Sequence, residues 1–535
     1  MITNTVVERL EKLIDVGIAL SAETDPLRLQ ERILESAREL TNADGGTLYS
    51  VKIDSVRIEI LRNTSLNMAL GGTSAPPSTL PPIPLYKADG TPNLNNVVTY
   101  AVHSDATVNI PDSYDTESFD FSGTRRFDAQ TGYRSTSFLT MPLRNHEHEI
   151  IGVLQLINAT SPETGAIVPF DAITQRLIEA LASQAAIALT KDQLIGELKK
   201  LFEALIHLIA DAIDRKSPYT GGHCRRVPAI TMGLAEAAHR ESSGPLQDFH
   251  LTDQDRYELE IAGWLHDCGK IITPVHVVDK ATKLETIFDR IHLVDSRFEV
   301  LKRDAEIACL KQQLAELGVT QLSPPLQQQL QSQLAELDEQ RDFLRRSNTG
   351  GEFMNQQDQD HVRSIGQHTW VLGGETVPLL NENEIYNLTI SRGTLTPEER
   401  KIINDHICAT IDMLNTLPFP KHLRNVPEYA GGHHERMDGK GYPKGLTREQ
   451  MSVQARILGI ADIFEALTAC DRPYKSAKTL SESLKIMFYM KKEGHIDPDL
   501  FEVFVRHQVY LQYAERFLLP EQIDEVNVEQ LLGGG

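Results

Sequence analysis

Apolar residues near the N-terminus recur every three or four positions. This spacing predicts two amphipathic helices between residues 6 and 40, divided at AETDP. Five runs typical of β-strands follow, separated by turn residues: GTLYSVKI, VRIEILRN, VVTYAVH, TSFLTMPL and IIGVLQLIN. A further helical pattern over residues 170–199 closes the region. Helices on one side of an antiparallel sheet indicate an α+β domain, which we assign to residues 1–190.

Helical periodicity continues from residue 185 to residue 214, with Gly196 as the single glycine and no proline. Its apolar positions are spaced by three, four and five residues: Leu189, Leu194, Leu198, Leu201, Leu205, Leu208 and Ala212. This pattern favours a helix that pairs with its copy in a second chain over a helix packed only within its own domain. We therefore expect residues 191–214 to connect two domains of a homodimer and to transmit a rotation or shift between them.

Length and composition narrow the class of protein. A chain of 535 residues is too long for one ordinary core and predicts two or three domains. The net charge of −22 argues against a nucleic acid polymer as partner, although a local basic cluster or a metal can still bind a small anion. No apolar run reaches membrane-spanning length and the N-terminus is unlike a signal peptide, so we expect a cytoplasmic protein without a membrane partner. The five cysteines lack CxxC spacing and predict neither a disulfide framework nor a zinc knuckle.

Three segments of the N-terminal region resemble a GAF domain: ADGGTLYSV, FDAQTGYRSTSFLTMPLRN and IIGVLQLIN. The resemblance covers about residues 5–192 and is greatest to the branch found in cyclic-nucleotide phosphodiesterases and adenylyl cyclases. It implies a sensory module with a pocket between the sheet and the loops at residues 112–133. Asn158 matches the family, whereas Ala159 stands where lysine is usual and Phe170 is not followed by the acidic pair. A small-molecule ligand, such as a cyclic nucleotide, and a role restricted to dimerisation are both open.

Histidines and carboxylates of the second half stand near the ends of predicted helices. His223 lies where a helix should start, and His266 and Asp267 end an apolar helix, with Lys270 one turn later. The capping pattern of GTLTPEERKIINDHI places His406 on another helix. Neutral imidazole and carboxylate are preferred ligands of divalent metals, so these residues are candidate ligands.

The stretch AGGHHERMDGKGYPKGL contains two adjacent histidines, His433 and His434. Adjacent residues share no helix or strand face, so their side chains converge only at the end of an element or in a turn. Such a pair indicates metal ligation, and a solvated surface turn is the alternative. Asp462 lies inside an otherwise apolar helix, where a buried carboxylate needs a positive partner. A metal is the simplest partner, and a salt bridge to Arg456 or Arg472 is the alternative.

Together, the pattern H…HD..GK…H…HHE..DG.GYP.GL…D resembles the HD-GYP domain, a subgroup of the HD superfamily of metal-dependent phosphohydrolases. The resemblance covers about residues 200–515 and implies an all-α domain, which we place at residues 215–520, before a C-terminal tail at 521–535. It implies hydrolysis of cyclic di-GMP to pGpG, with slower conversion to GMP as a further step. The alternatives are a metal-containing cyclic di-GMP receptor or signalling module with little turnover, and a hydrolase of another cyclic dinucleotide such as cyclic GMP-AMP.

The same resemblance implies roles for individual residues. The implied metal ligands are His223, His266, Asp267, His406, His433, His434 and Asp462. Asp267 would bridge two metals and Lys270 would contact a substrate phosphate. The implied substrate-binding residues are Lys270, Gly441, Tyr442, Pro443, Arg472 and Lys475. Two metals roughly 3.5–4 Å apart can activate a bridging water and stabilise both reacting oxygens of a phosphodiester.

The segment before His223 lacks the glutamate with which some family members hold a third metal. We therefore favour a binuclear site, with iron or manganese as the metals that the resemblance implies, and we expect Asp211 and Asp214 on a helix surface. Three cysteines lie close to implied ligands, and burial as small apolar residues is the default expectation for them: Cys224, Cys268 and Cys408.

A long gap separates Lys270 from His406. Both ATKLETIFDRIH and RGTLTPEERKIINDH resemble the segment with the family's middle histidine. We prefer His406 to His292 because GTLTPEE matches better and the step to His433 is short. Residues from about 281 to 391 are then an insertion, in which LKQQLAEL and PPLQQQLQSQLAELDEQRDFLRR predict a helical hairpin broken at SPP. Its histidines are expected in surface or local structural positions: His292, His361 and His368.

The predicted architecture is therefore multidomain. An α+β GAF domain with an antiparallel sheet comes first, a long connecting helix follows, and an all-α HD-GYP domain with a helical insertion completes the chain.

Overall fold

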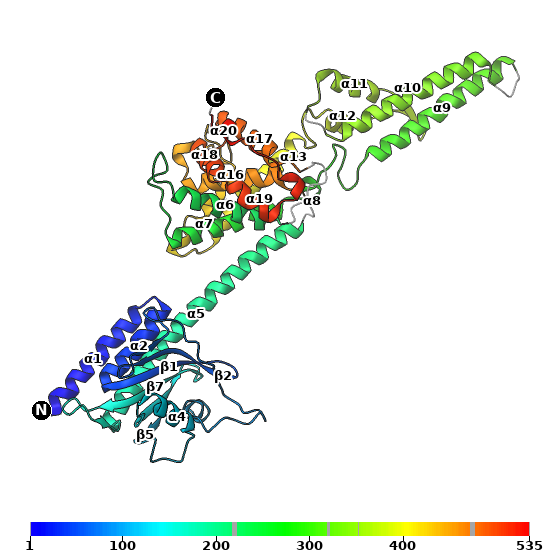
Figure 1. Cartoon of the computed structure of the whole chain (residues 1–535). Coiled ribbons are helices and arrows are strands. Elements are labelled where there is room, and N and C mark those ends of the chain that lie inside the picture. The colour runs from blue at the N-terminus through cyan, green and yellow to red at the C-terminus, as the bar shows by residue number, and fades with distance from the viewer. Residues whose placement is uncertain (1, 217–221, 318–321, 351–352, 471–476, 534–535) are drawn as a thin grey trace. The chain divides into compact units, whose positions relative to one another are not determined.

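Helix α5 (Ala172–Lys216) joins two structural units in the computed structural model of the chain (Figure 1). The units are Met1–Phe202 and Glu203–Gly535, and α5 begins in the first and ends in the second. The structure describes residues 2–216, 222–317, 322–350, 353–470 and 477–533. The helical pattern predicted between residues 185 and 214 is thus one uninterrupted helix. In these described ranges, no helix combines the length and the apolar character needed to cross a bilayer.

One antiparallel sheet forms the centre of the first unit, with the strand order β3-β2-β1-β7-β6-β5. Short strands β4 and β8 pair with β2 and β7. The strands are β1 (Ala43–Val51), β2 (Ser55–Asn63), β3 (Met68–Leu70), β4 (Ile83–Pro84), β5 (Val108–Ile110), β6 (Phe138–Arg144), β7 (Ile150–Thr160) and β8 (Ile167–Val168). The predicted α+β class with an antiparallel sheet is confirmed.

Alternation along these strands divides the side chains between two faces of the sheet. Leu48 and Leu154 share a core with Leu34 and Ile178, so this face packs on α2 (Pro26–Thr41), on α5 and on α1 (Ile2–Ala22). The opposite face places Tyr49 and Val153 against Val98 of α3 (Val97–Ser104). The short helix α4 (Ser122–Thr131) lies further along the chain.

Residues 97–103, VVTYAVH, were predicted as a strand and instead form α3, so this prediction is wrong. The preceding Asn96 caps the helix, because its side chain accepts hydrogen bonds from the backbone N–H groups of Val98 and Thr99. Val97, Val98 and Ala101 are buried at helical spacing. The cap and this tertiary contact outweigh the β propensity of the valines.

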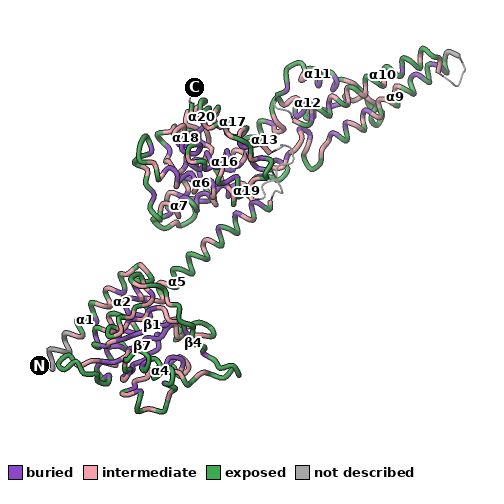
Figure 2. Tube along the Cα trace, in the orientation of Figure 1, coloured by how far each residue is buried: buried purple, intermediate pink, exposed green. Residues whose placement is uncertain are grey.

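The second unit is helical, as predicted for an HD-type domain, and buried residues concentrate along α6, α7 and α16 (Figure 2). The candidate ligands lie on or beside α6 (His223–His239), α7 (Asp253–Leu265), η1 (Cys268–Ile272), α14 (His406–Thr416), α15 (Val426–Gly431) and α16 (Val453–Thr468). Shorter connecting elements are α8 (Val275–Val278), α13 (Pro397–Asn404), η2 (Lys421–Leu423) and η3 (Arg448–Gln450). The C-terminal elements are α17 (Leu480–Lys492), α18 (Pro498–Arg506), α19 (Val509–Phe517), η4 (Pro520–Gln522) and α20 (Val528–Leu532).

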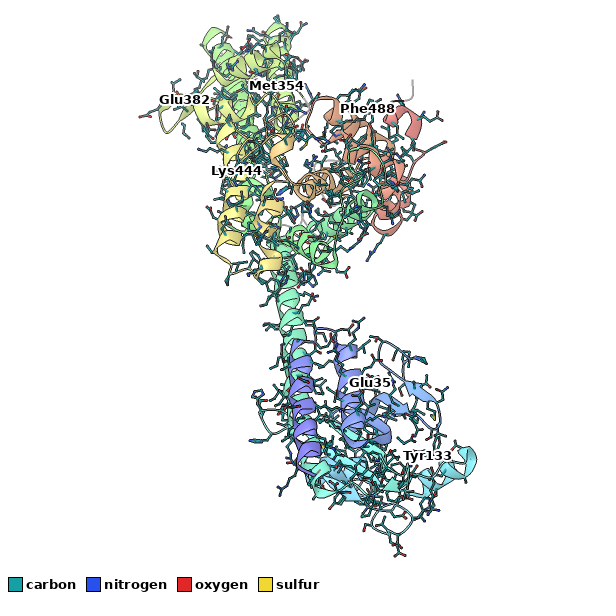
Figure 3. All side chains as sticks on the ribbon, turned by 90° about the vertical axis from the view of Figure 1, so that its left-hand side faces the viewer. Glu35, Tyr133, Met354, Glu382, Lys444 and Phe488 are labelled. Atoms are coloured by element: carbon teal, nitrogen blue, oxygen red, sulfur yellow. The ribbon has the colours of Figure 1, made fainter. Side chains whose placement is uncertain are left out.

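Two long helices, α9 (Ile291–Leu317) and α10 (Pro324–Asn348), form the hairpin predicted on either side of SPP. Ion pairs between the helices run in antiparallel register: Asp295 with Arg345, Glu299 with Arg341, and Lys302 with Asp338. This part of the chain has a hydrophobic core of its own, to which Phe298, Leu344 and Met354 belong (Met354 is labelled in Figure 3). Helices α11 (Gln356–Gly366) and α12 (Glu382–Leu388) complete that core.

A two-stranded antiparallel sheet also occurs here, formed by β9 (Thr369–Leu372) and β10 (Glu375–Pro378). The prediction of an all-α domain is therefore wrong at this point. Gly373 and Gly374 both have positive φ and make the tight turn between the strands.

Two buried lysines join the beginning and the end of this region. Lys280 Nζ donates to the two carboxylate oxygens of Glu399 at 2.9 and 2.7 Å and to Asn387 Oδ1 at 2.9 Å. Lys283 Nζ donates to the carbonyl oxygens of Leu388 at 3.0 Å and Ile390 at 2.8 Å. The segments that lead into and out of this region therefore lie side by side.

We expect Lys280→Met to destabilise the second unit, because the carboxylate of Glu399 loses its buried cation. Removing one partner of a buried ion pair should lower the free energy of unfolding by about 3 kcal/mol. Urea unfolding followed by circular dichroism measures this change. Lys302→Met is the matched control, since the side chain of its partner Asp338 is 43% exposed and the expected loss is about 1 kcal/mol or less. Equal losses in the two variants would contradict the anchoring role of Lys280.

Candidate metal centre

All but one of the predicted ligands lie at or beside the ends of helices. His223 is the first residue of α6, His266 and Asp267 follow α7, and His406 is the first residue of α14. His433 and His434 follow α15, and Asp462 lies within α16. The capping box predicted from GTLTPEE is present at the start of α13. That helix ends at Asn404 and His406 begins α14, so the prediction that His406 lies on the capped helix is wrong. Because side chains at helix ends can converge on one point, residues far apart in the sequence meet here.

A first group of ligand atoms is formed by His223, His266 and Asp267. His223 Nε2 lies 3.2 Å from His266 Nε2 and 3.0 Å from Asp267 Oδ2. Asp462 Oδ1 lies 3.4 Å from His223 Nε2 and 3.9 Å from His266 Nε2. All of these side chains are largely or fully buried. The group therefore combines imidazole and carboxylate atoms in a space the size of one coordination sphere.

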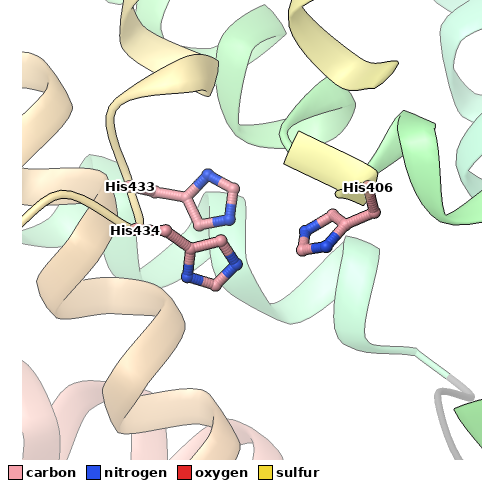
Figure 4. Close-up of side chains that lie close together, drawn as sticks. All are labelled: His406, His433 and His434. Carbon is pink, nitrogen blue, oxygen red and sulfur yellow. The ribbon is translucent and has the colours of Figure 1, made fainter. Parts of the chain in front are cut away.

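A second group consists of His406, His433 and His434, whose side chains face one another (Figure 4). Their candidate ligand atoms lie within 4.8 Å of one another. Asp267 connects this group to the first, because its Oδ1 lies 3.2 Å from His406 Nε2 while its Oδ2 faces His223. The geometry thus places one carboxylate between two histidine groups.

Local hydrogen bonds fix the orientation of three histidine rings. In each case Nδ1 bonds to the carbonyl oxygen of the residue three positions earlier. A carbonyl oxygen only accepts, so Nδ1 carries the proton and the lone pair of Nε2 faces the centre. The pairs are His266 with Gly263 at 2.8 Å, His406 with Ile403 at 2.5 Å, and His433 with Ala430 at 2.6 Å.

Three buried atoms that face the centre lack a hydrogen-bond partner among the described residues: Asp267 Oδ1, His406 Nε2 and His433 Nε2. Each unsatisfied buried polar atom costs about 1–3 kcal/mol, so three together indicate a missing electrophilic partner. Burial lowers the pKa of His433 to about 4, and burial together with His433 holds the pKa of His434 well below its ordinary value. Both imidazoles are therefore neutral, as metal ligation requires, and the residues fit a metal centre.

Lys270 is the cationic side chain of this centre. Its Nζ donates to Asp267 Oδ2. Burial lowers the pKa of Lys270, but Asp267 and Asp462 outweigh burial and raise that pKa above its ordinary value. Burial would likewise raise the pKa of Asp267, yet Lys270 and His266 hold it well below its usual range. The two side chains thus form an ionised pair between a buried carboxylate and a partly exposed lysine.

Glu465 is a residue of this site that the sequence analysis missed. Its fully buried carboxylate lies 2.5 Å from His223 Nδ1 and accepts a hydrogen bond from Arg226 Nε at 2.7 Å. Burial would raise the pKa of Glu465, but His223 and Arg226 lower it to about 2. Glu465 therefore orients the ring of His223 as the carbonyl groups orient the other histidines. The sequence did contain one indication of this role, because Glu465 follows Asp462 by three residues and so lies on the same face of α16.

The segment GYP lies beside the second histidine group. The ring of Tyr442 stacks on His434, with centroids 4.8 Å apart, and a cis peptide bond joins Tyr442 to Pro443. The carboxylate of Glu435 accepts hydrogen bonds from the backbone N–H groups of Lys444 at 2.7 Å and Leu446 at 2.9 Å. At Gly441 a Cβ atom would come within 2.3 Å of the backbone nitrogen of Arg436, so the turn excludes any side chain. Two further predicted substrate-binding residues, Arg472 and Lys475, lie outside the described residues.

Gly269 brings the two halves of the site together. A Cβ atom there would lie 2.0 Å from the carbonyl oxygen of His406, and the Gly269 N–H donates to Thr410 Oγ1 at 2.9 Å. Only glycine allows η1 to approach α14 this closely, and this approach places Asp267 beside His406.

The structure also separates the competing expectations. His406 lies at the centre, whereas the side chain of His292 is 77% exposed on α9. Arg456 pairs with Asp497, so it is not the partner of Asp462. The expectation for Asp214 is wrong, because its buried carboxylate accepts hydrogen bonds at the start of α6 instead of lying on a helix surface. Cys224 and Cys268 are buried as expected, but Cys408 is exposed.

Comparison with known families agrees with this architecture. A family model described as a GAF domain matches residues 25–189, and one described as an HD domain matches residues 379–500. The chain therefore carries an N-terminal GAF domain and a helical HD domain. The HD match contains His406, His433, His434 and Asp462, whereas the ligands of the first group precede it. The residues between these two parts include the α9–α10 hairpin.

Among curated relatives, 3'3'-cGAMP-specific phosphodiesterase 1 of Vibrio cholerae is 46% identical over 90 residues, which are 17% of this chain and 21% of the relative. A cyclic di-GMP phosphodiesterase of Pseudomonas aeruginosa is 45% identical over 74 residues, 14% of this chain and 17% of the relative. A third, 3'3'-cGAMP-specific phosphodiesterase 3 of Vibrio cholerae, is 38% identical over 112 residues, 20% of this chain and 23% of the relative. The chain thus aligns with about a fifth of the length of each relative.

We expect the double variant His266→Ala with Asp267→Ala to lose bound metal while its far-ultraviolet circular dichroism stays helical. The two substitutions remove two ligand side chains, one of which faces both histidine groups. Metal content by mass spectrometry after anaerobic purification measures the effect. His292→Ala is the control and should retain the full metal content. Metal loss in His292→Ala would reverse our choice of His406, and full metal content in the double variant would rule out His266 and Asp267 as ligands.

Proposed function

We propose that the second unit is a metal-dependent phosphodiesterase that hydrolyses cyclic di-GMP to pGpG, with slower conversion to GMP. The observation that carries this proposal is the convergence of five histidines and two aspartates beside Lys270. A receptor without turnover has no need of an ionised lysine bonded to the carboxylate that faces both histidine groups. Cyclic di-GMP phosphodiesterase is also the name of two relatives that align with 14% and 22% of this chain.

The ligand assignment follows from the two groups. His223, His266, Asp267 and Asp462 would hold one metal of a binuclear site. His406, His433 and His434 would hold the other, together with Asp267, and the donor types suit iron or manganese. When bound, such a pair supplies Lewis acidity and an activated water for attack on phosphorus.

Lys270 contributes charge at the position of the substrate phosphate. The side chain of Lys270 is 27% exposed, so this cation is accessible from solvent. As the attacking oxygen bonds to phosphorus, negative charge grows on the non-bridging oxygens, and a preorganised cation stabilises that charge. Asp267 holds Lys270 in place by accepting its hydrogen bond. The rings of His433 and His434 are neutral, so they add no positive charge that would slow release of the anionic product.

Hydrolysis of 3'3'-cyclic GMP-AMP is the second candidate activity. Two of the relatives described above are specific for that dinucleotide, and they align with this chain over 90 and 112 residues. The chemistry at phosphorus is identical for both substrates, so the choice depends on contacts to the bases.

We propose that the GAF domain senses a small molecule and regulates this activity. Asn158, which matches the family, holds the segment that follows the expected pocket loops. Its Oδ1 accepts from the Thr136 N–H at 2.7 Å, and its Nδ2 donates to the carbonyl oxygen of Arg134 at 2.8 Å. The buried carboxylate of Asp128 fixes the same segment by accepting two hydrogen bonds from Ser135.

We further propose that α5 pairs with its copy in a homodimer. A row of leucines alternates by four and three residues along this helix, which is the spacing of a two-stranded coiled coil. Their exposed fractions are between 49% and 67%: Leu194, Leu198, Leu201, Leu205 and Leu208. A single chain leaves this apolar stripe in water, so pairing with a second copy removes an unfavourable contact.

The activity is tested by incubating anaerobically purified protein, loaded with Fe(II) or Mn(II), with cyclic di-GMP and with 3'3'-cyclic GMP-AMP. We expect pGpG to appear and Lys270→Met to keep its metal while kcat falls by about 10²–10³-fold. Preferential turnover of cyclic GMP-AMP would establish the second candidate. Tight binding of cyclic di-GMP by fully loaded protein without product would establish a receptor instead.

Light scattering tests the dimer. We expect Leu198→Glu with Leu205→Glu to yield monomers, because paired glutamates would be buried at the core of the coiled coil. Lys200→Glu changes the charge of the same helix outside the stripe and should stay dimeric. A wild-type monomer, or a dimer that survives the leucine substitutions, would contradict pairing through α5.

A further inference from the structure

The last turn of α5 is bonded to the segment that carries Asp267 and Lys270. Lys216 Nζ donates to the carbonyl oxygens of Lys270 at 3.0 Å, Ile271 at 2.5 Å and Thr273 at 2.6 Å. An ammonium group has three donors, and these three carbonyls use all of them. They belong to the C-terminal end of η1, where a cation offsets the partial negative charge of unpaired carbonyl groups.

Two residues earlier on the same helix, Asp214 is bonded to the segment that carries His223. Its Oδ2 accepts from the Gly222 N–H at 3.0 Å, and its Oδ1 accepts from the Cys224 N–H at 3.3 Å. These N–H groups belong to the N-terminal end of α6, where a carboxylate is favoured by the helix dipole. The end of α5 thus offers an anion to one ligand-bearing segment and a cation to another.

The two segments held in this way meet at the first ligand group. His223 Nε2 lies 3.0 Å from Asp267 Oδ2. His223 stands between Gly222 and Cys224, whose N–H groups bond to Asp214, whereas Asp267 precedes η1, whose far end bonds to Lys216. Helix α7, which ends at His266, also contacts α5, because the rings of Trp264 and His207 lie 4.2 Å apart. The remaining ligands are carried by α14, α15 and α16.

We propose that Lys216 and Asp214 are positioning residues of the metal centre. Asp267 is the N-cap of η1 and Lys216 binds the opposite end of that short helix, so Lys216 sets where the Asp267 carboxylate and the Lys270 ammonium lie. Asp214 sets the start of α6 and thereby the ring of His223. The hydrogen bonds that place both residues in this role are made to backbone groups. The inference rests on the proposed function for its activity measurement alone.

The test uses the full chain with Lys216→Met, which keeps the length of the side chain and removes the three hydrogen bonds. We expect kcat to fall about 10-fold or more, because a small displacement of catalytic groups slows chemistry strongly. KM should change by no more than about 2-fold, since substrate contacts remain. Lys216→Arg should recover most of kcat, because a guanidinium can donate to the same carbonyl oxygens. Lys200→Met, an exposed lysine of the same helix, is the control and should behave as wild type.

Two measurements do not require turnover. In metal-free protein, amide hydrogen exchange at residues 268–273 should be faster in Lys216→Met than in Lys200→Met. The Mn²⁺ dissociation constant should increase by about 10-fold, as found when groups that orient metal ligands are removed. Asp214→Asn should weaken Mn²⁺ binding in the same direction, since it leaves the His223 segment without its carboxylate.

The outcomes separate the two proposals. If the wild-type protein hydrolyses neither cyclic dinucleotide, the proposed function fails, and exchange and Mn²⁺ affinity still decide the role of Lys216. Unchanged kcat and Mn²⁺ affinity in Lys216→Met would overturn the positioning role. Failure of Lys216→Arg to recover, together with loss of helical signal in both variants, would assign Lys216 to folding stability and would equally overturn it.

Discussion

The structure of the helical unit depends on one buried carboxylate. Asp267 is almost completely removed from water, and an isolated charge in that position would be too costly to retain. Its two oxygens face different histidine groups, and Lys270 donates to one of them. Burial of the Asp267 carboxylate is favourable only when Lys270 and the histidines are held in place, because displacement of Lys270 would leave a buried charge unpaired.

Much of the surrounding architecture meets this requirement through backbone groups at the ends of helices. Three histidines are oriented by carbonyl groups of their own segments, and Glu465 does the same for His223 from a distant helix. Gly269 and Gly441 allow backbone segments to approach each other more closely than any side chain would permit. Helix ends are suited to this task because their unpaired N–H and C=O groups are available for such bonds.

The chain tolerates a large segment between Lys270 and His406 because that segment folds around its own core and is closed at its base. The buried pair between Lys280 and Glu399 joins the end of one ligand-bearing region to the beginning of the next. The site is therefore assembled from two stretches of sequence that are distant along the chain and adjacent in space. The HD family model matches residues 379–500, which contain the second stretch.

The sequence by itself determined the local features of this protein. The resemblance of the HD and GYP segments to a known family implied the members of the centre. Capping residues predicted the start of α13, and apolar periodicity predicted the continuous α5. These features depend on contacts between near neighbours, which periodicity and capping rules describe. The strand prediction for residues 97–103 failed because burial of α3 against the sheet overrode the propensity of its valines.

Only the tertiary structure decided which distant groups support the centre. Glu465 lies 242 positions from His223, and Lys216 lies 54 positions from Lys270, so no local pattern connects either pair. Asp214 has the sequence context of an exposed helical residue, and it is buried because the start of α6 folds back onto α5. Side chains that orient other residues have no characteristic spacing of their own. Their positions are fixed by how the helices pack, which is why the sequence identified the candidate ligands and the structure identified what holds them.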